Sequence, residues 1–364
     1  MTIALKGRSI VKLPLALKLM FRRNANAEGE ISPFGAICTT LAGNLGTGNI
    51  VGVATALVAG GPGALFWIWV IAILGMACKY AEGFLAVKYR HVDEDGHVLG
   101  GPFYYIERGM GLKWKPLAKT FALFGGLAAA GSIGTTTQIN GIVDAVKNVF
   151  DPDSLHTVHV GALEYSTCTI IVSLILLVVV SVVLAGGLKR ITHVSEIVVP
   201  VMAILYILFC IAILIFNASY IPAAFGKVFV GAFDPSAVTG GAIGSFIIVL
   251  QKGIVRGVFS NETCLGSAPI AAAAARTDSP VEQGLVTMNS NFFDTLVVCT
   301  ATGIAIIMTD AWNVGMDGVS VTMYAFQNGL PFLPNGVTHI MLMLSLAFFA
   351  FTTIIGWEYY GERC

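Results

Sequence analysis

Two segments of the sequence place glycines and polar residues inside long apolar runs. Residues 43–49 hold three glycines and two asparagines, and residues 257–269 mix hydroxyl, amide and carboxyl side chains before ending at a proline. Glycine costs about 1 kcal/mol relative to alanine at each helical position, so we expect a helix to unwind at both segments. Unwound backbone leaves N–H groups without helical partners, and such groups beside the start of a half-helix can bind a carboxylate.

The two segments have a second interpretation. Small residues at residues 43–49 are also typical of a close helix crossing in a membrane, which needs no binding site. Irregular backbone at membrane depth, however, is tolerated only where it lines a cavity or is buried in protein. Two interrupted spans in corresponding halves of a chain are the best sequence indication of a secondary transporter's binding site.

The composition requires a membrane. Of 364 residues, 56% are hydrophobic and 12% are charged, whereas soluble domains carry about 25% charged residues. We therefore predict an all-α polytopic membrane protein with the lipid bilayer as its surroundings. The formal net charge is +0 and no basic block stands out, which argues against nucleic acid as a partner. The seven cysteines form no CxxC pair, so no metal or disulfide framework is expected.

Eight runs are apolar enough to cross a bilayer, which takes about 20 residues of helix. They cover residues 33–59, 62–89, 116–150, 166–184, 194–216, 240–275, 281–308 and 336–359. The interrupted spans are the first and the sixth, which is the spacing of a five-plus-five inverted repeat. We therefore expect a first repeat of five spans at residues 33–217 and an incomplete second repeat of three spans at residues 218–364.

Basic residues gather in alternate loops, which sets the orientation. The positive-inside rule places the N-terminus in the cytoplasm. Residues 1–32 are predicted to be a cytoplasmic amphipathic segment, with apolar residues such as Leu13 and Leu17 among basic ones such as Lys12 and Lys18. No secretory signal peptide is evident in this stretch.

Seven motifs carry a resemblance to a known family. They are Gly46–Ile50, Gly60–Gly63, Ala86–Arg90, Gly100–Tyr105, Gly257–Asn261, Leu265–Ile270 and Gly356–Glu362. The sequence resembles the alanine or glycine:cation symporter family, the sodium-coupled amino-acid transporters of bacteria and archaea. The resemblance implies a LeuT-type fold of ten core helices with one helix before them, in the plasma (inner) membrane.

The chain departs from the family pattern in two respects. No leading helix is visible and the last two core helices are missing, so the chain is expected to be a truncated form or fragment. Cys264 stands where the resemblance leads us to expect glycine, inside the second unwound segment. A side chain there reduces the conformational freedom of the backbone.

The resemblance implies a small neutral amino acid as substrate: alanine, glycine or serine. Its carboxylate would lie on the backbone N–H groups of Thr47 and Gly48. Its ammonium would face the carbonyl and side-chain oxygens of the second break, near Phe259 and Thr263.

Three further side chains are candidates for the walls of the substrate site. Gln138 lies in the middle of the third span, and an amide in lipid is costly, so it should face the interior of the bundle. It either binds the substrate or joins helices. Phe259 and Trp357 would limit the size of the substrate side chain. Ordinary packing is the alternative for Phe259, and an anchor at the membrane interface is the alternative for Trp357.

A sodium site is expected where the last span meets the first break. Thr352 and Thr353 are adjacent within an apolar run, and sodium favours neutral oxygens such as helix-break carbonyls and hydroxyls. We expect both hydroxyls to face the backbone carbonyls around Gly43–Leu45, so that Gly43 and Asn44 complete the sodium site. The resemblance agrees, because the first and eighth core helices of the LeuT fold meet at a sodium site. In the alternative, both hydroxyls bond to carbonyls one turn earlier.

Charged residues inside the spans need partners. Lys79 and Glu82 are three residues apart and can pair on one helix face. The cations Lys252 and Arg256 are expected to pair with Glu262 and Asp294 as a gate on the cytoplasmic side. Glu262 is also the candidate proton carrier, so proton coupling is the alternative to sodium coupling.

The sequence thus predicts a sodium-coupled symporter for small neutral amino acids that works by alternating access. A proton-coupled transporter using Glu262 and a non-transporting fragment remain alternatives. An intramembrane enzyme is disfavoured because no HExxH or GxSxG motif is present. A channel is disfavoured because the two breaks differ in sequence. We expect a monomer without cofactors, and no metal other than sodium.

Overall fold

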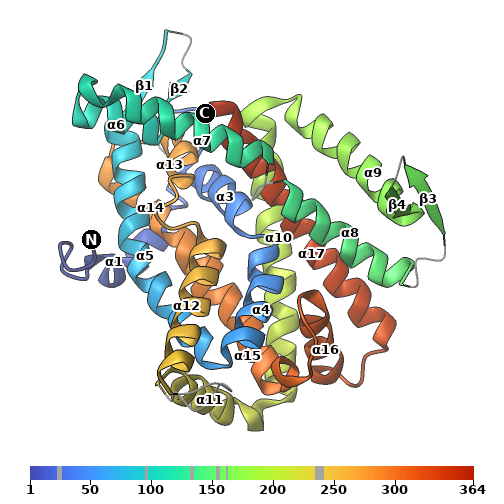
Figure 1. Cartoon of the computed structure of the whole chain (residues 1–364). Helices are drawn as coiled ribbons and strands as arrows, with labels where there is room; N and C mark the ends of the chain where they lie inside the picture. Colours follow the sequence, from blue (N-terminus) through green and yellow to red (C-terminus); the bar gives the residue numbers. More distant parts are fainter. Residues whose placement is uncertain (23–26, 95–96, 132–134, 153–155, 161–162, 234–241) are drawn as a thin grey trace.

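Most of the chain is helical, as the apolar runs predict (Figure 1). The computed structural model describes residues 1–22, 27–94, 97–131, 135–152, 156–160, 163–233 and 242–364. Within these ranges six helices are long and apolar enough to cross a membrane, and one bent pair of helices adds a seventh span. Two short hairpins, β1 (His91–Val92) with β2 (Val98–Leu99) and β3 (Thr157–Val160) with β4 (Leu163–Ser166), were not predicted.

The first predicted span is broken where the glycines occur. It consists of α3 (Pro33–Asn44), a π-helical turn η1 (Gly48–Gly52) and α4 (Val53–Gly60). The two halves are bent by 56° at the break. The Ser32 hydroxyl accepts the N–H of Gly35 at 2.8 Å and caps the start of α3, with proline at its first position.

The other spans of the first half follow the prediction closely. They are α5 (Gly63–Lys88), α7 (Lys115–Gly131) with α8 (Thr136–Phe150), α9 (Thr167–Leu184) and α10 (Gly187–Phe216). The prediction of one continuous third span lies partly outside the described residues, because residues 132–134 separate α7 from α8. α10 begins at Gly187 rather than at Val194, because a helix can extend beyond the apolar part of a span.

The second half begins with the other break. The sixth predicted span holds α12 (Ala242–Asn261) and α13 (Ala268–Ala273), and its expected start at residue 240 lies outside the described residues. Three residues of the linker have positive φ: Glu262 (52°), Cys264 (66°) and Gly266 (85°). This conformation suits glycine and strains other residues. Cys264 therefore occupies a left-handed position, where the resemblance had led us to expect glycine.

Two more spans complete the long helices. The seventh is α14 (Pro280–Asn291), a π-helical segment η5 (Phe292–Cys299) and α15 (Thr300–Met308). The eighth is α17 (Asn335–Arg363).

Several short elements were not predicted, because each is shorter than a membrane span. They are η2 (Leu112–Trp114), η3 (Ala218–Tyr220), η6 (Ala311–Asn313), α6 (Pro102–Met110), α11 (Ile221–Phe233) and α16 (Val319–Gly329). The predicted N-terminal amphipathic segment forms two short helices, α1 (Arg8–Val11) and α2 (Leu13–Leu19). α2 packs against α14, with Ala16 fully buried.

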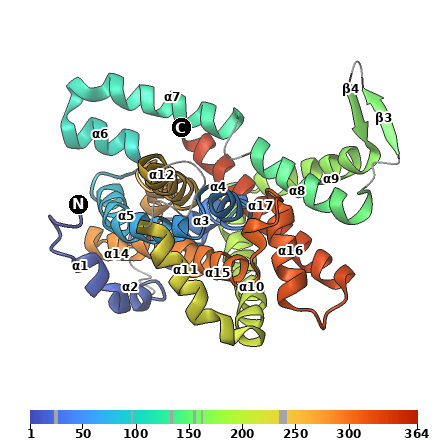
Figure 2. The same ribbon diagram turned by 60° about the horizontal axis from the view of Figure 1, so that its bottom comes forward.

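The two broken spans occupy the middle of the bundle (Figures 1 and 2). α5 packs along α12 and α14 on one side, and α17 packs against α3, α8 and α10 on the other. α3 and α17 cross with their backbones in contact, since a Cβ on Gly356 would lie 2.7 Å from the backbone N of Gly43. Gly43 thus serves the close crossing that the sequence offered as an alternative.

Candidate functional site

The two breaks contact each other directly. The Asn44 side chain, at the end of α3, donates from Nδ2 to the backbone carbonyl of Asn261 at the end of α12 (3.0 Å). Asn49 in η1 donates from Nδ2 to the Ser260 hydroxyl (3.1 Å). All four residues are buried. The two interrupted segments that the sequence singled out therefore lie in contact in three dimensions.

The first break is filled by side chains from the protein itself. The N–H of Gly46 donates to Asn49 Oδ1 (2.9 Å), and the N–H of Thr47 donates to Gln138 Oε1 on α8 (3.1 Å). The Thr47 N–H, which was expected to bind the substrate carboxylate, thus donates to a side-chain amide of the protein. Gln138 is 3% exposed and faces the interior, as predicted. A Cβ on Gly46 would lie 2.5 Å from the Thr353 hydroxyl and 3.0 Å from Gln138 Oε1, so only glycine fits.

Phe259 and Thr263 lie on the second break, but in different settings. A Cβ on Gly48 would meet the Phe259 ring at 3.4 Å, so this aromatic side chain borders the predicted carboxylate position. The Thr263 hydroxyl is bonded to Asn291 Nδ2 of α14 at 2.7 Å. Thr263 therefore ties the break to α14.

Trp357 connects α17 to the second break. Its indole N–H donates to Glu262 Oε1 at 2.7 Å, and the Ser267 hydroxyl lies 2.5 Å from Glu262 Oε2. The Trp357 side chain is 4% exposed, so it is no anchor at the surface. It borders a cavity of about 350 Å³ that is otherwise lined mainly by α7, by residues 265–267 of the second break and by the end of α17.

The two adjacent threonines of α17 make different contacts. Thr353 Oγ1 is 2.9 Å from the Leu45 carbonyl and 3.0 Å from the Phe349 carbonyl. Thr352 Oγ1 is 3.1 Å from the Phe348 carbonyl and 3.0 Å from the Phe349 carbonyl, within its own helix. Thr353 thus lies against the first break, and both hydroxyls also lie within hydrogen-bond distance of carbonyls one turn earlier, as the alternative expected.

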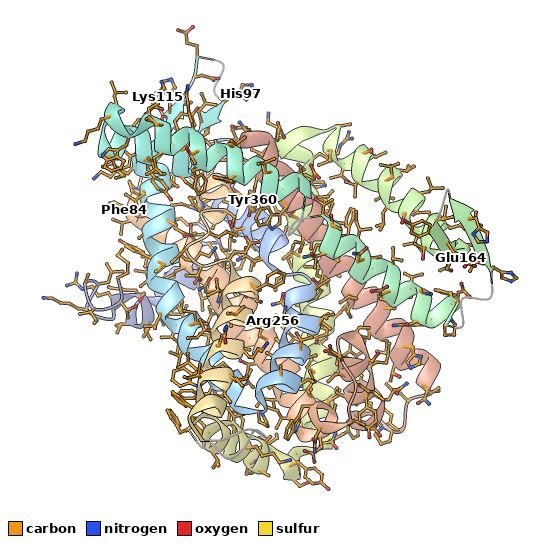
Figure 3. The ribbon with its side chains drawn as sticks, in the orientation of Figure 1. Phe84, His97, Lys115, Glu164, Arg256 and Tyr360 are labelled. Carbon is orange, nitrogen blue, oxygen red and sulfur yellow. The ribbon has the colours of Figure 1, made fainter. Side chains whose placement is uncertain are left out.

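The expected pairing of cations with carboxylates is not found among the described residues. Lys252 is exposed, Arg256 is half-buried on α12 (Figure 3), and neither forms an ion pair there. The sequence could not foresee this, because Glu262 and Asp294 satisfy their oxygens with neutral donors instead. Lys79 and Glu82 do pair, at 3.9 Å.

Asp294 belongs to a polar cluster that the sequence reasoning missed. Its carboxylate accepts from Asn49 Nδ2 (2.7 Å), from the Ser260 hydroxyl (3.0 Å) and from the Thr295 hydroxyl (2.6 Å). The cluster joins η1, α12 and η5, and all four residues are buried. The polar residues in the two glycine-rich motifs were a signal for it, but nothing in the sequence pointed to their partner in the seventh span.

A second group of contacts holds the outer ends of α3 and α13 together. Residues 28–31 run beside residues 274–277, where Ile31 donates to the Ala274 carbonyl (3.1 Å) and accepts from the Arg276 N–H (2.7 Å). The guanidinium of Arg90 donates to four carbonyls, those of Glu28, Ala273, Ala275 and Thr277, at 2.6–2.8 Å. We call these contacts the Arg90 clamp. Arg90 lies in one of the motifs that carry the family resemblance, but nothing in its sequence neighbourhood indicated this role.

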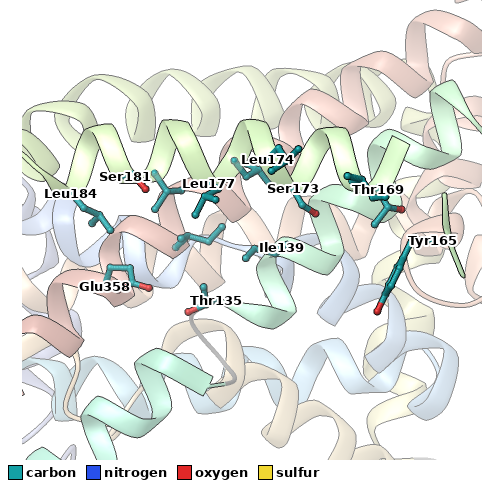
Figure 4. Close-up of a pocket in the computed structure, with 14 residues that line it drawn as sticks. Thr135, Ile139, Tyr165, Thr169, Ser173, Leu174, Leu177, Ser181, Leu184 and Glu358 are labelled. Atoms are coloured by element: carbon teal, nitrogen blue, oxygen red, sulfur yellow. The ribbon is translucent and has the colours of Figure 1, made fainter. Parts of the chain in front are cut away.

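A larger cavity lies away from the breaks (Figure 4). It has a volume of about 630 Å³ and is lined mostly by apolar side chains of α8, α9 and α17, with Glu358 at its edge. No predicted site residue borders it, so it is not the candidate site.

Comparison with known proteins gives the family. The model of the sodium:alanine symporter family matches residues 1–364. The chain is 48% identical to an uncharacterised transporter of Haemophilus influenzae over 366 residues, which cover 100% of this chain and 76% of the relative. It is 44% identical to the sodium/alanine symporter AgcS of Methanococcus maripaludis over 373 residues, which cover 100% of this chain and 77% of the relative.

A solved structure gives the fold. The crystal structure of MhsT in complex with L-phenylalanine matches with a TM-score of 0.62 at 16% identity, over 92% of this chain and 73% of that chain. At this identity the likeness concerns the fold alone, and it confirms the predicted LeuT-type architecture. The match to the family model over the whole chain, with the two relatives above, shows that the chain belongs to the sodium:alanine symporter family.

Proposed function

We propose that this chain moves a small neutral amino acid together with sodium across the plasma membrane by alternating access. The observation that carries the proposal is the meeting of the two breaks, where Asn44 and Asn49 of one broken span bond to Asn261 and Ser260 of the other. Half-helix ends at such a junction suit the opposite charges of an amino acid. Membership of a symporter family supports the same conclusion.

The substrate carboxylate is proposed to lie on the N–H groups of Thr47 and Gly48. Gln138 Oε1 now occupies the Thr47 N–H, so binding requires the Gln138 side chain to turn and present its own N–H₂ to the carboxylate. Phe259 beside Gly48 and Trp357 beside Glu262 then limit the size of the substrate side chain. This arrangement favours alanine, glycine or serine.

The coupling sodium is proposed to bind where α17 meets the first break. The Thr353 hydroxyl and the Leu45 carbonyl are 2.9 Å apart, and neutral oxygens of this kind are sodium ligands in broken-helix transporters. The carbonyl of Gly43 and the hydroxyl of Thr352 are further ligands if the hydroxyl turns from its own helix. Sodium here would hold the first break in one arrangement and raise amino-acid affinity. By linkage, the amino acid must raise sodium affinity by the same factor.

Proton coupling through Glu262 is the second candidate. Glu262 is buried, both of its oxygens are hydrogen-bonded, and it forms no ion pair among the described residues. Burying an ionised carboxylate without a cation is costly, and a proton removes that cost.

One experiment separates the two coupling ions. Alanine binding is measured across sodium concentrations at two pH values in wild type, Thr352→Val with Thr353→Val, and Glu262→Gln. Sodium coupling predicts that the double-valine protein loses most of its sodium dependence. Full sodium dependence in that protein would refute the site. A pH dependence lost only in Glu262→Gln would favour the proton.

A further inference from the structure

A buried lysine lies in the interface between α5 and α14. Gly75, Lys79 and Gly83 are four residues apart on one face of α5. A Cβ on Gly75 would lie 2.4 Å from Asn291 Nδ2, and one on Gly83 would lie 2.3 Å from Thr287 Oγ1, so this face packs directly against α14. Lys79 therefore faces α14 at a level between two neutral side chains, neither of which can balance its charge.

The Lys79 ammonium has few direct partners. The residue is 0% exposed, and its Nζ has no hydrogen-bond partner among the residues that the structure describes. Its ion-pair contact is Glu82 Oε2 at 3.9 Å, and that oxygen also lacks a hydrogen-bond donor in the same part of the chain. Lysine is almost never fully buried unless it is paired, and burying a charge is costly. One long ion pair does not explain why this lysine is kept inside the bundle.

The charge of Lys79 acts on three carboxylates rather than one. They are Glu82, Glu262 and Asp294, which we call the buried carboxylates. Glu262 and Asp294 also repel each other. The donors that bond to these two are indole, amide and hydroxyl groups, which orient a carboxylate but carry no charge.

Lys79 is the one cation of the described ranges whose charge acts on any of the buried carboxylates. Arg256 on α12 forms no ion pair in those ranges, α13 holds no titratable residue, and Glu282 of α14 pairs with Arg22 at the surface. The other titratable side chains beside the buried carboxylates are thiols and phenols, which bring no positive charge: Cys78, Cys264, Tyr105 and Tyr360. Any further positive charge here must come from a bound ion or a proton.

We infer that Lys79 determines the specificity for the coupling ion, because its fixed ammonium supplies the positive charge that a proton on one of the buried carboxylates would otherwise bring. Sodium at the first break is then left as the cation that is bound and released during transport. The inference rests on the proposed function and adds to it the residue that favours sodium over the proton. Lys79 acts through the carboxylates and contacts neither substrate nor ion, so it is a positioning residue.

The test replaces Lys79 with methionine, which keeps an unbranched side chain and removes the charge. Alanine binding is measured across pH at saturating sodium in wild type, Lys79→Met and Lys252→Met. In Lys79→Met, a proton taken from water by a carboxylate oxygen can restore the missing positive charge only at low pH. Relative to wild type, its alanine affinity should therefore fall as the pH rises, by up to about tenfold per pH unit for one linked proton. Lys252→Met removes an exposed cation and should follow the wild-type profile.

A second variant separates charge from shape. Lys79→Met with Glu82→Gln removes one charge of each sign, so the net charge of the group is that of wild type. Its pH profile for alanine binding should run parallel to the wild-type profile, although the lysine is still missing.

Thermal unfolding across pH gives a readout that needs no substrate. The native form of Lys79→Met holds a proton that the unfolded chain releases, so its stability should fall with rising pH more steeply than that of wild type. The double variant should again run parallel to wild type.

Three results would overturn the inference. A loss of alanine affinity in Lys79→Met that is equal at every pH would mean that the lysine only fills space. A wild-type pH profile in that variant would mean that the carboxylates need no cation. The same steep profile in the single and the double variant would mean that charge balance is not the cause. A wild-type protein that binds no alanine would instead refute the proposed function, and the unfolding measurement would still decide the role of Lys79.

Discussion

The two breaks solve the same structural problem in different ways. In the first break the freed backbone groups are bonded to side chains: Asn49 of the break itself to Gly46, Gln138 of α8 to Thr47 and Thr353 of α17 to Leu45. The second break instead adopts strained conformations, with positive φ at Glu262 and Cys264. The backbone groups of the first break are thus held by side chains, and under the proposed function the substrate and sodium replace these bonds. The second break is a strained bend whose position is set by its neighbours.

The neighbours of the second break explain why it holds its strain. Thr263 is bonded to Asn291 of α14, and Glu262 is bonded to Trp357 of α17. Strained backbone persists only where surrounding contacts over-determine it. The difference between the breaks therefore assigns exchangeable contacts to the first and positioning to the second.

The largest expected effect comes from filling the first break. Gly46→Val places a branched side chain where a Cβ alone would lie 2.5 Å from the Thr353 hydroxyl. Both Thr353 and Gln138 must move, so we expect alanine binding to fall by more than about 100-fold. Gly336→Val is the control, because nothing lies within 4 Å of a Cβ at that position. Near-wild-type binding of alanine by purified Gly46→Val would show that the first break is not the site.

A smaller effect separates the two threonines. Thr353→Val removes the hydroxyl that bonds to the Leu45 carbonyl of the first break. Thr352→Val removes a hydroxyl whose carbonyl partners both lie in its own helix, α17. We expect Thr353→Val to lower alanine affinity about tenfold at limiting sodium, about 1.4 kcal/mol. Thr352→Val should change it by less than about threefold. Alanine binding is measured across sodium concentrations in both single variants. Equal losses of alanine affinity would mean that both hydroxyls bind the same sodium ion.

The sequence predicted the breaks but not what they touch. Glycines among polar residues inside apolar runs announce unwound helix, because helix propensity is a local property. Both interruptions followed from that signal, and the six long helices followed from the apolar runs. The partners of Asn49 could not be predicted, since Asp294 is 245 positions away along the chain. Spacing along a helix predicted the Lys79–Glu82 pair for the opposite reason, because the two residues are neighbours on one turn.

Predictions based on charge were the least accurate for the contacts at the site. Opposite charges inside a membrane were expected to pair, and Lys252 and Arg256 were therefore assigned to Glu262 and Asp294. The carboxylates are bonded instead to Trp357, Asn49 and hydroxyl groups. Hydrogen bonds from neutral donors can satisfy a buried carboxyl group as well as an ion pair can, and sequence alone does not reveal which is used.

The Arg90 clamp tests whether the two broken spans move together. It ties the segment before α3 to the segment after α13 through four carbonyls. Arg90→Gln keeps at most two of these donors, so the outer ends of both half-helices should separate more readily. We expect alanine uptake into proteoliposomes to fall severalfold while equilibrium alanine binding stays within about threefold. Lys88→Gln is the control, since Lys88 lies over the rings of Phe84 and Tyr89 and outside the clamp. Unchanged uptake in Arg90→Gln would mean that the clamp does not gate transport.

The smallest expected effect measures the strain in the second break. Cys264 has φ 66°, a left-handed conformation that costs a non-glycine residue about 1–2 kcal/mol. Cys264→Gly removes that cost and loses part of the gain to the greater freedom of glycine in the unfolded chain. We therefore expect the free energy of unfolding to rise by about 1 kcal/mol, with alanine affinity unchanged. Cys264→Ala is the matched control, because it removes the thiol and keeps the strained φ. Thermal unfolding in detergent compares the three proteins. If the alanine variant is as stable as the glycine variant, the thiol rather than the backbone sets the stability, and the second break is not the strained bend that distinguishes it from the first.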